Sequence, residues 1–149
     1  MKVSITFRKA DKEDIYFLLA LRKQTMDGYL ADAGIVTSES YHLERINEHY
    51  EDSNIILCDG QVIGLLKLGL LPTSLHIRQF QILPEFQSRG IGAKVLELVK
   101  RKAHEQGLPI TLNVLLKNPA KSLYERAGFK VIEQNDFEYQ LKFVESPSD

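Results

Sequence analysis

The spacing of apolar and polar residues changes several times along the chain. The two alternate over residues 3–7, which predicts a strand, and apolar residues then recur at helical spacing over residues 11–26, with Asp11 as the N-cap. The pattern lapses over residues 27–34, which predicts a loop, and a second helix is expected over residues 38–50. The first third of the chain thus predicts one strand followed by two helices.

Strand patterns dominate from residue 53 onward. Asp59-Gly60 separates two apolar runs and predicts a hairpin with a two-residue turn. One helix is expected over residues 91–106, and a shorter one opens at Asn118-Pro119 and ends at Gly128. The other predicted strands cover residues 55–58, 61–71, 75–83, 110–116, 129–132 and 137–144, and the polar tail, residues 145–149, is expected to fray.

The order of these elements is β-α-α-β-β-β-α-β-α-β-β. This order indicates a mixed α/β fold with a central, mostly antiparallel, twisted sheet of about seven strands and helices on both faces. No internal repeat or linker interrupts the sequence, so we expect one domain over residues 1–149.

Composition and charge exclude several classes of function. The 149 residues are 44% hydrophobic and 26% charged with a formal net charge of −1, so no overall field draws the chain to nucleic acid or to an anionic membrane. The single cysteine, Cys58, lies in an apolar run, is expected in the core, and fits a reducing compartment. Early charged residues do not fit a signal peptide, and the run over residues 62–71 contains Lys67 and is shorter than the roughly 20 residues of a membrane span. We therefore expect a soluble, cytoplasmic protein.

The turn before the helix at residues 91–106 carries the strongest chemical signal. It reads Gln87-Ser88-Arg89-Gly90-Ile91-Gly92-Ala93 and follows a strand that stops at Pro84. The first turn of a helix has backbone N–H groups without partners and the positive end of the helix dipole, and glycines let an anion approach the main chain. The segment therefore predicts a site for a phosphate or diphosphate.

Glycines also precede helices in other kinds of phosphate site and in tightly packed helix pairs. A dinucleotide-binding unit would have a third glycine, but Gly92 is followed by Ala93, Lys94 and Val95, and the Gly-Lys-Ser/Thr of a P-loop is absent. Glycines that serve only close helix packing remain an alternative.

A second motif follows about thirty residues later. It reads Asn118-x-Ala120-x-x-Leu123-Tyr124-x-x-x-Gly128-Phe129. In this order and on these elements, the two motifs together resemble the GCN5-related N-acetyltransferase (GNAT) superfamily, and the element order resembles it over nearly the whole chain.

The resemblance implies acetyl-CoA as the co-substrate and no metal. Backbone N–H groups from Gln87 to Ala93 would bind the pyrophosphate, and the strand near residues 80–83 would pair with the pantetheine arm where two central strands splay apart at a bulge. Pro84 is consistent with such a break, because proline cannot donate to a strand ladder. Asn118 would hydrogen-bond the pantetheine, and Tyr124 would protonate the departing thiolate. The full set of expected cofactor contacts is Phe80, Gln81, Ile82, Leu83, Gln87, Ser88, Arg89, Gly90, Ile91, Gly92, Ala93, Asn118, Lys121 and Tyr124.

Acetyl transfer to an amine needs a neutral amine, a stabilised oxyanion and a leaving thiolate. A tyrosine hydroxyl is a sufficient acid for the thiolate, and no covalent nucleophile is required. The alternative for Tyr124 is a buried aromatic ring whose hydroxyl reaches a carbonyl.

The base that deprotonates the amine is expected to be His76. It lies six residues before Ile82 on one predicted strand and so is expected on the same face, and histidine titrates near neutral pH. A histidine satisfied by a neighbour is the alternative, and water, Glu85 or Gln79 are other candidate bases.

The substrate is expected at residues 26–50 and 135–139. Acidic residues there, Asp27, Asp32, Glu44 and Glu48, would attract a cationic amine, and Tyr29 and Tyr41 would stack on it. Small polyamines, amino acids, aminoglycoside-like amines and protein N-termini or lysines all remain open, and so does a homodimer.

An N-acetyltransferase that transfers acetyl directly to a primary amine is the first functional hypothesis. A non-catalytic acyl-CoA-binding regulatory domain would share the phosphate site but release no CoA. A phosphate-binding module of another fold would need a parallel sheet, which the two predicted hairpins disfavour.

Overall fold

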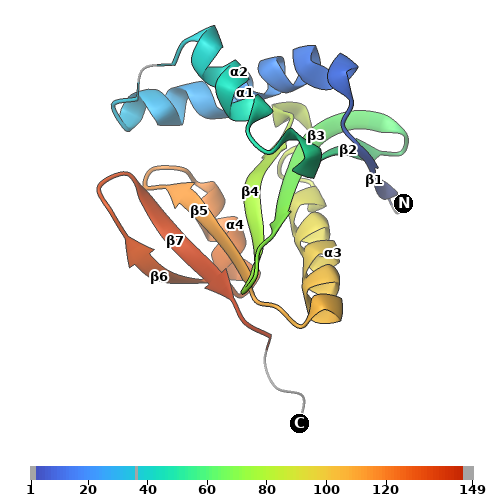
Figure 1. Cartoon of the computed structure of the whole chain (residues 1–149), viewed down its shortest axis with the longest axis vertical. Helices are drawn as coiled ribbons and strands as arrows, with labels where there is room; N and C mark the ends of the chain where they lie inside the picture. Colours follow the sequence, from blue (N-terminus) through green and yellow to red (C-terminus); the bar gives the residue numbers. More distant parts are fainter. Residues whose placement is uncertain (1–2, 36, 146–149) are drawn as a thin grey trace.

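The computed structural model describes residues 3–35 and 37–145, so the predictions for residues 146–149 lie outside it. A seven-stranded sheet with the order β1-β2-β3-β4-β5-β7-β6 forms its centre (Figure 1). The strands are β1 (Ile5–Lys9), β2 (Ser53–Cys58), β3 (Gln61–Leu70), β4 (Leu75–Ile82), β5 (Ile110–Leu115), β6 (Lys130–Gln134) and β7 (Glu138–Phe143). The helices are α1 (Ile15–Asp32), α2 (Glu39–Asn47), α3 (Ile91–Gln106) and α4 (Ala120–Arg126), with short 3-10 turns η1 (Lys12–Asp14), η2 (Tyr50–Asp52) and η3 (Pro84–Phe86). The predicted fold class and element order are confirmed.

The sheet separates two clusters of buried side chains. Helices α3 and α4 cover one face, where Val95 and Leu96 of α3 pack with Leu66, Ile77 and strand residues from both halves of the sheet. Helices α1 and α2 cover the other face, in a smaller cluster that contains Leu18, Leu21, Ile46, Ile55 and Leu65. The helices therefore lie on both faces, as predicted.

Local signals placed most of the turns correctly. Asp59 and Gly60 both have positive φ, 50° and 84°, as a two-residue hairpin turn requires. The side chain of Asp11 accepts the N–H of Glu13 in a capping box with Asp14, and Ser38 caps α2 by accepting the N–H of Tyr41.

The loop predicted over residues 27–34 was wrong. Helix α1 continues to Asp32, and the chain leaves it at Gly34, which has a φ of 78°. The polar pattern misled because Leu30, buried on this last stretch, is enough to hold the helix against the fold. Gly28 lies inside α1, where glycine lowers the stability of the helix but does not end it.

Strands β4 and β5 pair only at one end. They are the one parallel pair among the described strands, and the pairing covers Leu75–Ile77 with Ile110–Leu112 before the strands diverge (Figure 1). The divergence coincides with a bulge in β4, because Lys67 of β3 pairs with Gln79 and Leu68 pairs with Ile77, which leaves Arg78 without a partner position. The break thus occurs at Arg78 and not at Pro84, which begins the 3-10 turn after the strand.

Candidate functional site

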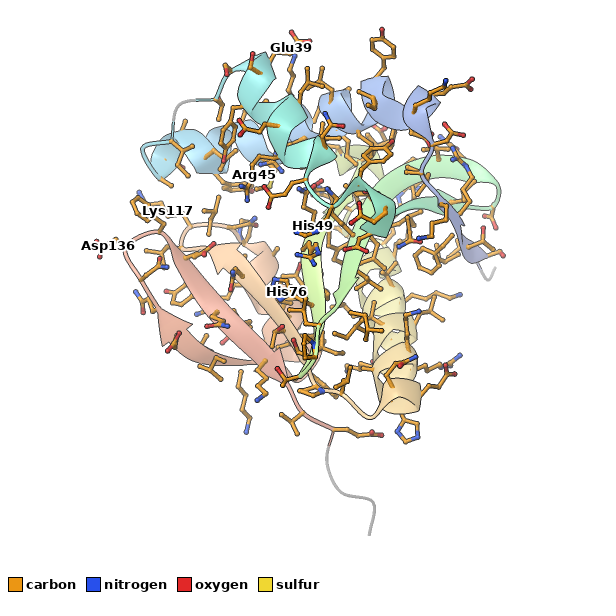
Figure 2. The ribbon with its side chains drawn as sticks, in the orientation of Figure 1. Glu39, Arg45, His49, His76, Lys117 and Asp136 are labelled. Carbon is orange, nitrogen blue, oxygen red and sulfur yellow. The ribbon has the colours of Figure 1, made fainter. Side chains whose placement is uncertain are left out.

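A cleft of about 490 Å³ opens where β4 and β5 diverge. Its walls come from α1 and α2, from the free edge of β4, from β5 and the start of α4, and from the β6–β7 turn. Figure 2 shows Arg45 and His49 between α2 and β4, with His76 further along β4. Residues 135, 137 and 138 and several residues between 26 and 50 line the cleft, so it lies where the sequence predicted the substrate.

The turn from residue 87 to residue 93 has the backbone of an anion site. Ser88 and Gly90 both have left-handed conformations, with φ of 61° and 79°, and Gly90 is the N-cap of α3. The N–H of Gln87 donates to Pro84, and among the described residues no backbone acceptor lies opposite the N–H groups of residues 88–93. These donors lie at the positive end of a 16-residue helix. Gln87 has another role, because its Nε2 donates to the carbonyl of Ile82 at 2.9 Å and ties the turn to β4.

The two glycines of the turn have different structural reasons. Gly90 is required for its positive φ, which residues with a Cβ rarely adopt. Lack of space is not the reason, because a Cβ there would meet no atom within 4 Å. A Cβ on Gly92 would lie 3.0 Å from Cδ2 of Leu123, so this glycine lets α4 pack against the start of α3. Gly92 therefore allows close packing, and this contact joins the two motifs in space.

The free edge of β4 offers backbone donors to the cleft. Leu83 donates its N–H to Ile63 of β3 at 2.8 Å, and amides of a strand alternate in direction. The N–H groups of Phe80 and Ile82 therefore point to the opposite edge, where β5 has diverged. Of the four predicted contacts on this strand, Phe80 and Ile82 have free amides, while Gln81 and Leu83 are bonded within the sheet.

Tyr124 reaches the cleft from the face covered by α3 and α4. The residue is 6% exposed, and its ring packs edge-on against Phe129 with 5.7 Å between centroids. Burial raises the pKa of its hydroxyl, which is therefore protonated at neutral pH. No protein acceptor holds this hydroxyl among the described residues, unlike the alternative in which it reaches a carbonyl.

The remaining predicted cofactor residues surround these elements. Oδ1 of Asn118 accepts the N–H of Ala120, the first residue of α4, at 2.9 Å, and Asn118 lines the cleft. The Lys121 ammonium lies 4.2 Å from the ring centroid of Tyr139 and 3.8 Å from Glu125, so it is used within α4 and β7. Arg89 is exposed and stacks on Phe86 at 5.3 Å.

His76 lies on the opposite face from the one predicted. The bulge at Arg78 inserts one residue, so His76 shares its face with Gln79, Gln81 and Lys67, while Ile82 faces α3. The even spacing between His76 and Ile82 misled because it assumed a regular strand. His76 consequently lines the cleft from the side covered by α1 and α2.

Hydrogen bonds leave one nitrogen of His76 available to the cleft. Its Nδ1 lies 2.7 Å from Oγ1 of Thr111, which in turn donates to Oγ of Ser74 at 3.2 Å. With Thr111 as the donor to Ser74, His76 donates from Nδ1, and Nε2 carries the free lone pair. Burial, and secondarily the charge of Arg78, lowers the pKa of His76, so the ring is neutral at pH 7.

Three buried polar residues near the cleft were not singled out from sequence. Arg22, His42 and Lys67 are each 5% exposed or less. The Lys67 ammonium donates to the carbonyls of Ile46 and Glu48 at 2.9 and 2.7 Å and so caps the end of α2, and burial lowers its pKa to about 8. The sequence signal for Lys67 was its position inside an otherwise apolar run, because burial of a charged side chain is costly unless it has partners.

Of the four acidic residues expected to attract a cationic amine, Glu48 lines the cleft and the other three do not. Asp27 accepts a hydrogen bond from His42, and Glu48 pairs with Arg45 at 3.1 Å. Asp32 and Glu44 are exposed and do not line the cleft. Of the two tyrosines expected to stack on the amine, Tyr41 lines the cleft and Tyr29 does not.

Comparison with known proteins identifies this arrangement. The family described as "Acetyltransferase (GNAT) domain" matches residues 23–145, which include the turn, the splayed strands and Tyr124. The chain belongs to the GNAT acetyltransferase family. As a GNAT protein it is 30% identical over 116 residues to an uncharacterized N-acetyltransferase of Chlorobaculum tepidum, a match that covers 77% of this chain and 71% of the relative.

Solved GNAT structures have the same fold. PaiA N-acetyltransferase of Thermoplasma acidophilum, in complex with coenzyme A, is similar with a TM-score of 0.73 and 21% identity over 94% of this chain and 98% of that one. Naa50 of Arabidopsis thaliana, in complex with a bisubstrate analogue, has a TM-score of 0.68 and 15% identity over 95% of this chain and 99% of that one. None of the helices described in this GNAT chain has the length and apolar character to cross a bilayer.

Proposed function

We propose that this protein is an N-acetyltransferase, a single catalytic domain that moves the acetyl group of acetyl-CoA to a primary amine without a covalent enzyme intermediate. One observation carries the proposal. Tyr124 and His76 approach one cleft from opposite faces of the sheet, at the opening between β4 and β5. An acid and a base are thus available on the two sides of a thioester that enters this opening.

The binding of acetyl-CoA is supported by two groups of donors. The N–H groups of residues 88–93 and the dipole of α3 suit the two linked phosphates. The amides of Phe80 and Ile82 suit a pantetheine arm that pairs with β4 as an added strand. The relatives crystallised with coenzyme A and with a CoA-containing bisubstrate analogue support a CoA-type co-substrate.

The chemistry follows from these positions. A neutral amine attacks the carbonyl carbon of the thioester, the carbonyl oxygen becomes an oxyanion, and a β4 amide stabilises its charge. The C–S bond then breaks, the sulfur takes the proton of the Tyr124 hydroxyl, and the proton lost by the amine goes to Nε2 of His76. Burial makes Tyr124 a weaker acid, but it also makes a thiolate in the same dry site a stronger base than in water. The pKa values of the hydroxyl and of the CoA thiol are therefore raised together, and the proton transfer remains feasible.

A binding domain without turnover is the second hypothesis. It would have the same anion site but no use for a protonated, unpartnered tyrosine and a neutral histidine at one opening. The free hydroxyl of Tyr124 and the free nitrogen of His76 favour the enzyme.

Two linked measurements test the proposal. Calorimetry with acetyl-CoA is expected to give one site per chain, and a thiol assay is expected to detect CoA release that depends on an added amine. Binding without release for every amine in a panel of amino acids, polyamines and peptides would favour the regulatory domain. Absence of binding would reject both hypotheses.

A further inference from the structure

The wall of the cleft on the α1 and α2 side is rich in positive charge. Four cationic side chains line the cleft, Arg22, Arg45, Lys67 and Arg78, against two carboxylates, Glu48 and Glu138.

Three of these cations have partners that balance them. Arg45 pairs with Glu48 at 3.1 Å, Arg78 pairs with Asp52 at 3.0 Å, and Lys67 donates to backbone carbonyls of the α2 end. The charges of Arg45, Arg78 and Lys67 are therefore already paired with groups of the protein.

Arg22 is different because no carboxylate touches it among the described residues. It is 5% exposed, and its Nε donates to Nδ1 of His42 at 3.0 Å. The ring of Tyr41, with its centroid 5.8 Å from Cζ, is the aromatic neighbour. Burial lowers the pKa of this guanidinium, and the nearby Tyr41 and Asp27 side chains offset part of that effect. Arginine still stays charged, and a buried charge that no carboxylate contacts is costly. Arg22 lines the cleft, and its bond to His42 uses Nε and neither of its two terminal nitrogens.

The orientation of Arg22 is fixed by a relay behind it. Nε2 of His42 lies 2.6 Å from Oδ1 of Asp27, and His42 is 1% exposed. Because Nδ1 of His42 accepts from Arg22, the ring donates from Nε2 to Asp27. A guanidinium held by Nε presents its terminal nitrogens in the planar arrangement that binds a carboxylate with two parallel hydrogen bonds.

The positive wall also has a consequence for the amine. It disfavours a simple cationic diamine, but it lowers the pKa of a bound ammonium and so favours the neutral nucleophile. A substrate that carries both an amine and a carboxylate gains from both effects.

We propose that Arg22, positioned by His42 and Asp27, binds a carboxylate of the acceptor, and that the substrate is an amine that also carries a carboxylate. This inference rests on the proposed N-acetyltransferase function and names its substrate class. Arg22 is then the specificity-determining residue, and His42 is a positioning residue.

The test uses amine pairs that differ only in the carboxylate, such as lysine and cadaverine or tyrosine and tyramine. The wild type is expected to have a kcat/KM about 10- to 100-fold higher for the carboxylated member, the range of a hydrogen bond to a charged group. Peptides with a free N-terminus and an acidic second residue form another arm, which distinguishes a free amino acid from a peptide as the source of the carboxylate.

Variants locate the preference. Arg22→Met is expected to remove it by lowering kcat/KM for the carboxylated amine while the value for its partner changes less than about threefold, and Arg22→Lys is expected to restore part of it. If Arg22→Met does not fold, His42→Gln is the second variant, because it keeps Arg22 and removes only the group that positions it. It should reduce the ratio of the two kcat/KM values by a smaller factor. Arg101→Met, the same change at an exposed site on α3, is the control and should leave the ratio unchanged.

Two kinds of failure can be told apart. Equal activity of the wild type on both members, or an equal loss on both in Arg22→Met, would overturn the carboxylate site and leave the acetyltransferase intact. No CoA release with any amine would instead reject the proposed function, and the substrate inference with it.

Discussion

The two faces of the sheet are built by different means. The face covered by α3 and α4 has an almost wholly apolar core, and its candidate ligand groups are backbone amides and one tyrosine. The face covered by α1 and α2 buries Arg22, His42 and Lys67 in and beside a smaller apolar cluster. A main-chain site suits a constant ligand such as a cofactor, since it depends on backbone shape, whereas buried charges can be exchanged to select among amines.

Replacement of Tyr124 by Phe tests the chemistry assigned to the α3 and α4 face and should have the largest effect. The ring would stay packed on Phe129, so we expect kcat to fall by about 100-fold, the range of general acid catalysis, with little change in affinity for acetyl-CoA. The rate of CoA release at saturating concentrations of both substrates measures this kcat. Tyr16→Phe, at an 85% exposed position, is the control, and an unchanged kcat in Tyr124→Phe would remove the acid role.

Gly64→Ala tests the strand pair that lies between the two faces. A Cβ at this position would lie 2.3 Å from the carbonyl oxygen of Gln81, a main-chain atom that cannot move alone. We expect the free energy of unfolding, measured in urea, to fall by about 2 kcal/mol. Gly28→Ala, inside α1 with no atom within 4 Å of the added Cβ, is expected to raise it by up to about 1 kcal/mol, and a loss equal to that of Gly64→Ala would contradict this packing account.

The pH dependence of catalysis tests the base on the α1 and α2 face. His76 must be neutral to accept a proton, and its pKa is lowered, so kcat/KM is expected to rise with pH through a limb below pH 6.5. In His76→Gln that limb should be lost, and kcat/KM at pH 7 should fall by about tenfold, since water can replace part of a general base. His104→Gln, at an exposed histidine bonded to Glu145, is the control. A variant with the wild-type limb would reject His76 as the base.

Lys67 offers a smaller, thermodynamic test of the charges buried on that face. Its pKa is about 8 in the folded protein against 10.5 in the unfolded chain, so the unfolded state binds more protons between these values and stability rises with pH there. The free energy of unfolding of the wild type relative to Lys67→Met should therefore increase by about 1 kcal/mol from pH 7 to pH 9. A constant difference would mean that Lys67 titrates normally.

The same contrast separates what the sequence could predict from what it could not. The fold and the turn follow from local signals, namely apolar periodicity and glycines at a helix start, whereas Tyr124 was singled out by the resemblance of two motifs to the GNAT superfamily. The face of His76 did not follow, because the bulge at Arg78 shifts the alternation by one residue and depends on pairing with β3. The Asp27–His42–Arg22 relay joins residues of two helices, so only the packing of α1 on α2 brings it together.

A crystal structure of the complex with coenzyme A tests the central claim most directly. The account predicts the pyrophosphate on the amides of residues 88–93, the pantetheine arm along Phe80 and Ile82, and the sulfur within hydrogen-bond reach of the Tyr124 hydroxyl. Coenzyme A bound elsewhere, or with its sulfur remote from Tyr124, would contradict it.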